Sequence, residues 1–87
     1  MSIARFAKSQ LYDSGRMVVM FNAYVGENMI ACAISMEALQ DHFENNTRKP
    51  VETFNRHRHA IERVAETLIA RQRFEADGSI LICTADC

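Results

Sequence analysis

The chain has 87 residues and a formal net charge of −1, with 10 lysines and arginines against 11 aspartates and glutamates. This length predicts one domain over residues 1–87, and 48% hydrophobic with 24% charged residues argues against disorder. The balanced charge makes a dedicated nucleic-acid binder an unfavoured class, because such proteins need a basic surplus to displace counterions from phosphates.

The chain shows neither a membrane span nor a secretion signal. No apolar run approaches the roughly 20 residues that cross a bilayer. The start, MSIARF, has no long apolar stretch and no cleavage-site pattern. Three cysteines, Cys32, Cys83 and Cys87, are an odd count and predict no disulfide framework. We therefore expect a cytoplasmic protein, since a reducing compartment suits free thiols.

The first third of the chain predicts strands. Residues 3–6 form a short strand, and the polar stretch 8–16 contains the turn residues Asp13, Ser14 and Gly15. Residues 17–25 are rich in valine, methionine and aromatic side chains that alternate between two faces. Residues 29–34 return after a turn, which predicts an antiparallel hairpin. The alternation places on one face Val19, Phe21, Ala23 and Val25.

Two helices and a final strand follow. Ser35 is suited to cap a helix over residues 36–43, because its hydroxyl accepts a hydrogen bond from a backbone N–H of the first turn. Pro50 is suited to the first position of the next helix, where its missing N–H is not needed. Apolar spacing extends that helix over residues 51–73. Residues 80–84 form the last strand.

The order β-β-β-α-α-β predicts an α+β fold, a small antiparallel sheet with two helices packed on one face. The other face of the hairpin then carries Val18, Met20 and Tyr24. An apolar face of that size marks an interface with a partner. We therefore expect a homodimer, or another protein partner, on that face.

The long helix carries the candidate binding site. His57 and Arg58 flank its apolar stripe, and Glu62 follows Arg58 by four residues. One interpretation is a solvated, salt-bridged helix edge. The other is that His57, Arg58 and Glu62 line a groove for an anion or a partner, because an arginine grips a carboxylate or phosphate through two N–H groups and a histidine adds pH dependence.

Metal and cofactor sites are not expected. The two rings of His57 and His59 point about 200° apart on a helix, whereas helical zinc ligands favour spacings of four residues. Cys83 and Cys87 have a loose zinc spacing but lie at the C-terminus, where chains fray. Cys32 lies on a strand and is interpreted as a small buried hydrophobic residue.

Two other function classes stay open. A small enzyme would use His57 or Cys32 as its reactive group, which requires a cleft that holds both a base and a nucleophile. No phosphate-binding glycine loop and no nucleophile-elbow motif supports such an enzyme. Weak nucleic-acid binding would use the arginine-rich helix, because residues 48–63 hold five basic and two acidic side chains.

The chain also resembles a family of small bacterial proteins of unknown function, DUF1488. The resemblance rests on Val19 and Phe21, Gly26, the stretch 30–35, Ala38, Leu39 and Phe43, and above all on the pattern Phe54-x-x-His57-Arg58-x-x-Ile61-Glu62-x-x-Ala65. Tyr12 stands where the family tends to have a tryptophan. The resemblance implies a compact α+β domain from a Gram-negative-type bacterium, and it implies no activity. We expect a small binding or regulatory accessory protein.

Overall fold

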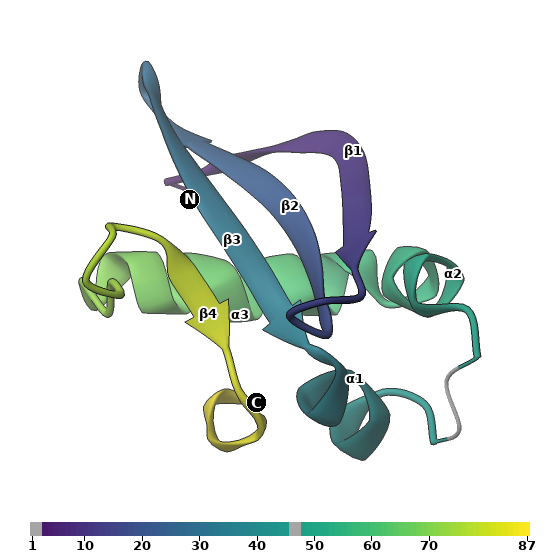
Figure 1. The fold of residues 1–87 in the computed structure, drawn as a ribbon. Helices are drawn as coiled ribbons and strands as arrows, with labels where there is room; N and C mark the ends of the chain where they lie inside the picture. Colours follow the sequence, from purple (N-terminus) through teal and green to yellow (C-terminus); the bar gives the residue numbers. More distant parts are fainter. Residues whose placement is uncertain (1–2, 46–47) are drawn as a thin grey trace.

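The computed structural model describes residues 3–45 and 48–87 and shows a four-stranded sheet packed against three α-helices (Figure 1). The elements in chain order are β1 (Arg5–Asp13), β2 (Val18–Val25), β3 (Asn28–Ser35), α1 (Met36–His42), α2 (Pro50–Arg56), α3 (Arg58–Ala70), β4 (Ile80–Ile82) and the short 3-10 helix η1 (Thr84–Asp86). The predicted α+β class is confirmed, and the elements follow the predicted order except that the second predicted helix is divided in two.

The sheet is mixed rather than purely antiparallel. Its strand order is β1-β2-β3-β4, and the first three strands form an antiparallel meander. β4 pairs parallel to β3, with Cys32 opposite Ile80 and Ile34 opposite Ile82. The helices form the crossover between these two strands, so the chain re-enters the sheet in the direction of β3. The expectation of an antiparallel last strand was therefore wrong.

Local signals placed the hairpin and the helix starts correctly. Val19, Phe21 and Ala23 are buried on the inner side of β2. The hydroxyl oxygen of Ser35 accepts a hydrogen bond from the backbone N–H of Ala38 at 3.1 Å and caps α1. Pro50 is the first residue of α2.

Three predicted elements differ in extent from the structure. The last strand ends at Ile82 instead of residue 84, and Thr84 is the first residue of η1. The first strand runs over Arg5–Asp13 instead of residues 3–6. Its pairing shifts between Phe6, opposite Ala23, and Gln10, opposite Phe21, so three residues of β1 face one residue of β2. We call residues 7–9 the β1 bulge. This bulge interrupts the two-residue alternation, which explains why the polar stretch did not read as a strand.

The single long helix predicted for residues 51–73 is two helices. His57 has φ −113° and ψ 16°, and its N–H bonds to the carbonyl oxygens of both Thr53 and Phe54. A new helix then starts with the bond from Ile61 N–H to the His57 carbonyl. Figure 1 shows α2 nearly end-on and α3 lengthwise, so the two axes diverge at His57.

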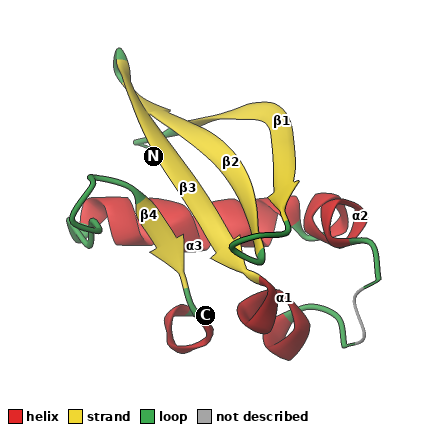
Figure 2. Ribbon diagram, viewed as in Figure 1, coloured by secondary structure: helices red, strands yellow, loops and turns green. Residues whose placement is uncertain are grey.

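One core joins the inner sheet face to the helices. α3 crosses behind the sheet (Figure 2), with Ile61, Ala65 and Leu68 in the core. The buried ring of Phe54 in α2 lies 5.0 Å from the ring of Phe21 in β2, measured between centroids. All three helices thus contribute side chains to the same side of the sheet.

Candidate functional site

Arg58, the central residue of the predicted site, binds the β1 bulge. Its Nη1 donates a hydrogen bond to the carbonyl oxygen of Ala7 at 3.2 Å, and its Nη2 donates to the carbonyl oxygen of Lys8 at 3.0 Å. Nη2 also donates to the side-chain oxygen of Gln10, where regular pairing resumes. The guanidinium therefore supplies donors to backbone carbonyls at the place where β1 leaves its regular register with β2.

The rest of the Arg58 side chain is held by the helices. Nη2 donates to Oδ1 of Asn55 at 2.9 Å, and Nη1 lies 3.4 Å from Oε2 of Glu62, the ion pair expected from their spacing. The guanidinium carbon sits 4.8 Å from the centroid of the Phe54 ring, a cation–π contact. The Arg58 side chain is only 17% exposed. Its donors face acceptors of the chain itself, which favours a structural role.

His57 belongs to a different cluster, around Glu44. The Nε2 atom of His57 lies 3.0 Å from Oε2 of Glu44, and the His57 ring packs at a tilt against the Phe43 ring, with 5.3 Å between centroids. Arg56 donates to both carboxylate oxygens of Glu44 at 2.7 Å. This contact is bidentate. It ties the residues after α1 to the junction between α2 and α3.

The carboxyl group of Glu44 is correspondingly acidic. Hydrogen bonds from Arg56, and less strongly from His57, lower its pKa from 4.5 to about 2. A group with a lowered folded-state pKa stabilises the fold above its unfolded pKa and loses that contribution as the pH falls. The contribution of Glu44 is thus complete above about pH 4.5 and disappears toward about pH 2.

This linkage gives a testable prediction. The wild-type free energy of unfolding, measured by urea titration, is expected to fall between pH 5 and pH 2.5 by more than that of the Glu44→Gln variant, because the variant has no carboxylate to protonate. Glu75→Gln, at an exposed position in the α3–β4 connection, is the matched control. Equal pH dependence of wild type and Glu44→Gln would contradict the prediction.

Glu62 faces a hollow of about 290 Å³ between α3 and the start of β1. The hollow is lined by Phe6, His59, Glu62, Arg63 and Glu66. Oε1 of Glu62 lies 3.5 Å from Nδ1 of His59, whose side chain is 93% exposed. Glu66 accepts a hydrogen bond from the backbone N–H of Ala4 at 3.2 Å. The structure thus joins Arg58 to Glu62, and it places His57 with Glu44 instead.

The cysteines lack the environment of a nucleophile. Burial raises the pKa of the Cys32 thiol to about 11, so this thiol stays protonated at neutral pH. Burial, followed by nearby acidic groups such as Asp86, also raises the pKa of Cys83 and Cys87. Within residues 3–45 and 48–87, no group of three or more His, Cys, Asp or Glu side chains is placed to hold a metal ion.

The outer face of the sheet, the side opposite the described helices, is a second candidate surface. Cross-strand register fixes which side chains belong to it, because paired residues share a face. Leu11 pairs with Met20, and Tyr24 pairs with Met29. Leu11 is 64% and Met29 is 60% exposed. The apolar side chains of the outer face are Leu11, Val18, Met20, Tyr24, Met29, Ala31, Ala33 and Leu81.

Comparison with known proteins identifies the family. The model of the DUF1488 family, described as a protein of unknown function, matches residues 5–82. The chain belongs to the DUF1488 family. A solved structure of a DUF1488 protein of unknown function from Shewanella loihica PV-4 is 25% identical, with a TM-score of 0.80, and the similarity covers 94% of this chain and 93% of that one. A search among curated proteins finds no match.

The family assignment confirms the resemblance drawn from the sequence, and the similar structure also has no known function. None of the helices formed by the described residues is long and apolar enough to cross a bilayer. The sequence did not predict two contacts between distant segments, that of Arg56 with Glu44 and that of Arg58 with the β1 bulge. Neither has a local signal, because each joins positions that only the fold brings together.

Proposed function

We propose that this DUF1488 protein is a small accessory protein of the bacterial cytoplasm that acts as a homodimer through the outer face of its sheet. The observation that carries the proposal is the apolar outer face, on which Leu11 and Met29 are each at least 60% exposed. Exposed apolar surface of this kind, next to charged groups, is typical of interaction sites. Free cysteines at positions 32, 83 and 87 support a reducing compartment.

The charges beside this surface favour a second copy as the partner. Arg16 and Asp77 line a small hollow together with Met20, Ala31 and Ala33. By register, Arg5 opposite Tyr24 and Asp13 opposite Val18 lie on the same face. A surface with both positive and negative groups around an apolar centre does not repel its own copy, and a two-fold arrangement can bring opposite charges together. A strongly acidic or basic partner would gain nothing comparable.

The size of the outer face matches a weak dimer. Strands lie about 4.8 Å apart and eight residues span about 26 Å, so the four strands outline about 400 Å². Protruding side chains and the flanking turns add to this area. The total then approaches about 600 Å² per partner, the size of a small specific interface. We therefore expect a dissociation constant in the micromolar range.

The test introduces a charge in the middle of the outer face. Ala31 is exposed and points outward from β3, so Ala31→Glu is expected to abolish the dimer by burying an unpaired carboxylate. Ala60→Glu, at an exposed position of α3, is the matched control and should leave the dimer intact. Sedimentation velocity across a concentration series measures both. A wild type that stays monomeric at 200 µM, or an Ala31→Glu variant that dimerises like wild type, would refute the proposal.

A further inference from the structure

We infer that a hollow in the outer face receives the Met29 side chain of a second copy, and this inference rests on the homodimer proposed above. The hollow has a volume of about 180 Å³. It is lined by Ser9, Gln10, Leu11, Met20, Phe21 and Asn22, and we call it the bulge hollow. It is larger than the hollow of about 70 Å³ beside Met20, Ala31 and Ala33, and it offers a concave point at which a partner side chain can be anchored.

The position of the bulge hollow follows from strand register. Leu11 and Met20 are paired and point outward, and Asn22 lies two residues further along β2 on the same side. Asn22 pairs with Ala31 of β3, but on its other side the β1 bulge replaces regular pairing, so no β1 residue in ordinary register fills the space there. The hollow therefore opens on the outer face.

Arg58 stabilises the backbone that shapes this hollow. It donates to the carbonyl oxygens of Ala7 and Lys8 from the helical side of the sheet. The bulge hollow lies on the opposite side of the same backbone segment, where Ser9 forms part of its lining. Arg58 is thus a positioning residue for the interface, although its guanidinium points away from the partner.

Met29 is the side chain suited to enter the bulge hollow. Among the outer-face residues of the strands, Leu11 and Met29 are the large hydrophobic side chains that are mostly exposed, and Leu11 already lines the hollow. A methionine side chain has four heavy atoms and fills about 100 Å³, where one water molecule takes about 30 Å³. The hollow of about 180 Å³ therefore has room for it. Its unbranched, flexible shape lets it fit an irregular cavity.

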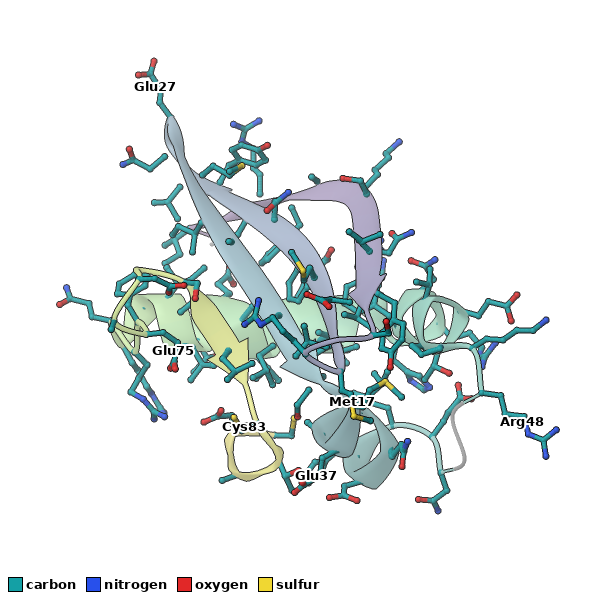
Figure 3. The ribbon with its side chains drawn as sticks, viewed as in Figure 1. Met17, Glu27, Glu37, Arg48, Glu75 and Cys83 are labelled. Atoms are coloured by element: carbon teal, nitrogen blue, oxygen red, sulfur yellow. The ribbon has the colours of Figure 1, made fainter. Side chains whose placement is uncertain are left out.

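Two-fold symmetry makes this contact twice. In a dimer of this kind, if Met29 of one copy contacts the bulge hollow of the other, the reverse contact forms as well. Met29 lies in β3 next to the hairpin turn that carries Glu27, while Met17 lies at the other end of the sheet beside α1 (Figure 3). Met17 is 57% exposed and does not belong to a strand, so it provides a matched control.

The experiment measures the dimer dissociation constant by sedimentation equilibrium for wild type, Met29→Ala, Met17→Ala and Asn22→Phe. Met29→Ala is expected to raise the dissociation constant at least about thirtyfold, the effect of losing a well-packed anchor residue. Met17→Ala is expected to stay within about threefold of wild type, as a residue outside the anchored contact. Asn22→Phe fills the bulge hollow and should weaken the dimer as Met29→Ala does.

Combining Met29→Ala with Asn22→Phe supplies the decisive comparison. If Met29 occupies the hollow, the two effects overlap and the double variant is weakened by clearly less than the product of the single effects. Additive effects, or a Met29→Ala dimer as tight as wild type, overturn this inference while the outer-face homodimer stands. A wild type that is monomeric at 200 µM overturns both. Should Asn22→Phe fail to fold by circular dichroism, the comparison of Met29→Ala with Met17→Ala decides alone.

Discussion

Replacement of Arg58 by alanine is expected to lower the free energy of unfolding by about 3 kcal/mol, on the scale of about 1.5–3 kcal/mol for a hydrogen bond to a charged group. The guanidinium donates to the Ala7 and Lys8 carbonyl oxygens and covers the Phe54 ring. Removal of the guanidinium takes away these donors and uncovers the ring. Water can hydrate part of the bulge, which limits the loss in the free energy of unfolding. Urea unfolding followed by circular dichroism at pH 7 measures the change.

Two further variants show why the change occurs. Arg58→Lys keeps the positive charge but lacks the planar fork that reaches several acceptors, so it should be destabilised almost as strongly as alanine. His59→Ala, next in the chain and with a side chain 93% exposed, should change stability by less than about 0.5 kcal/mol. If Arg58→Ala were as stable as wild type, the arginine would not hold the bulge, and anion binding by Arg58 would become the better explanation for its position.

The parts of the fold that were predictable depend on residues close together in the chain. Ser35 caps α1 through a hydrogen bond to the third residue after it, and Arg58 pairs with Glu62 one helical turn later. Alternation along β2 identified the inner side chains Val19, Phe21 and Ala23. In each case a short-range rule was sufficient because the interaction closes within a few residues.

The features of the fold that were predicted wrongly depend on tertiary contacts. The sequence near His57 does not predict the helix break, because it contains neither glycine nor proline. The break coincides with the Glu44 contacts of Arg56 and His57, which come from a segment more than ten residues away. The parallel pairing of β4 likewise depends on the path of the crossover and not on its own short sequence.

The candidate site illustrates the same limit. The pattern of His57, Arg58 and Glu62 correctly identified residues with dense polar contacts, but it did not show what they contact. Arg58 binds backbone carbonyl oxygens, which every residue possesses, so its partners leave no mark in the sequence. A charged motif therefore predicted a position of structural importance, and only the register shift in β1 explains it.

Replacement of Phe54 by alanine is expected to cause the largest loss of stability, about 4 kcal/mol, within the range of about 3–5 kcal/mol for a buried phenylalanine. Phe54 has no exposed surface, and its ring lies against that of Phe21 in the middle of the core. The guanidinium of Arg58 also lies over this ring. The substitution thus creates a cavity between sheet and helices and also removes the surface on which Arg58 rests.

Because the two side chains share a contact, their substitutions should not be independent. The double variant Phe54→Ala, Arg58→Ala is expected to lose less stability than the two single losses added together, by about 1 kcal/mol, the usual size of coupling between contacting residues. Phe74→Ala is the control, since Phe74 is 42% exposed in the α3–β4 connection and should cost less than about 1 kcal/mol. Strict additivity in urea unfolding would mean that Arg58 holds the β1 bulge without support from the ring. Coupling would show that the core and the bulge, and through the bulge the outer face, are stabilised together.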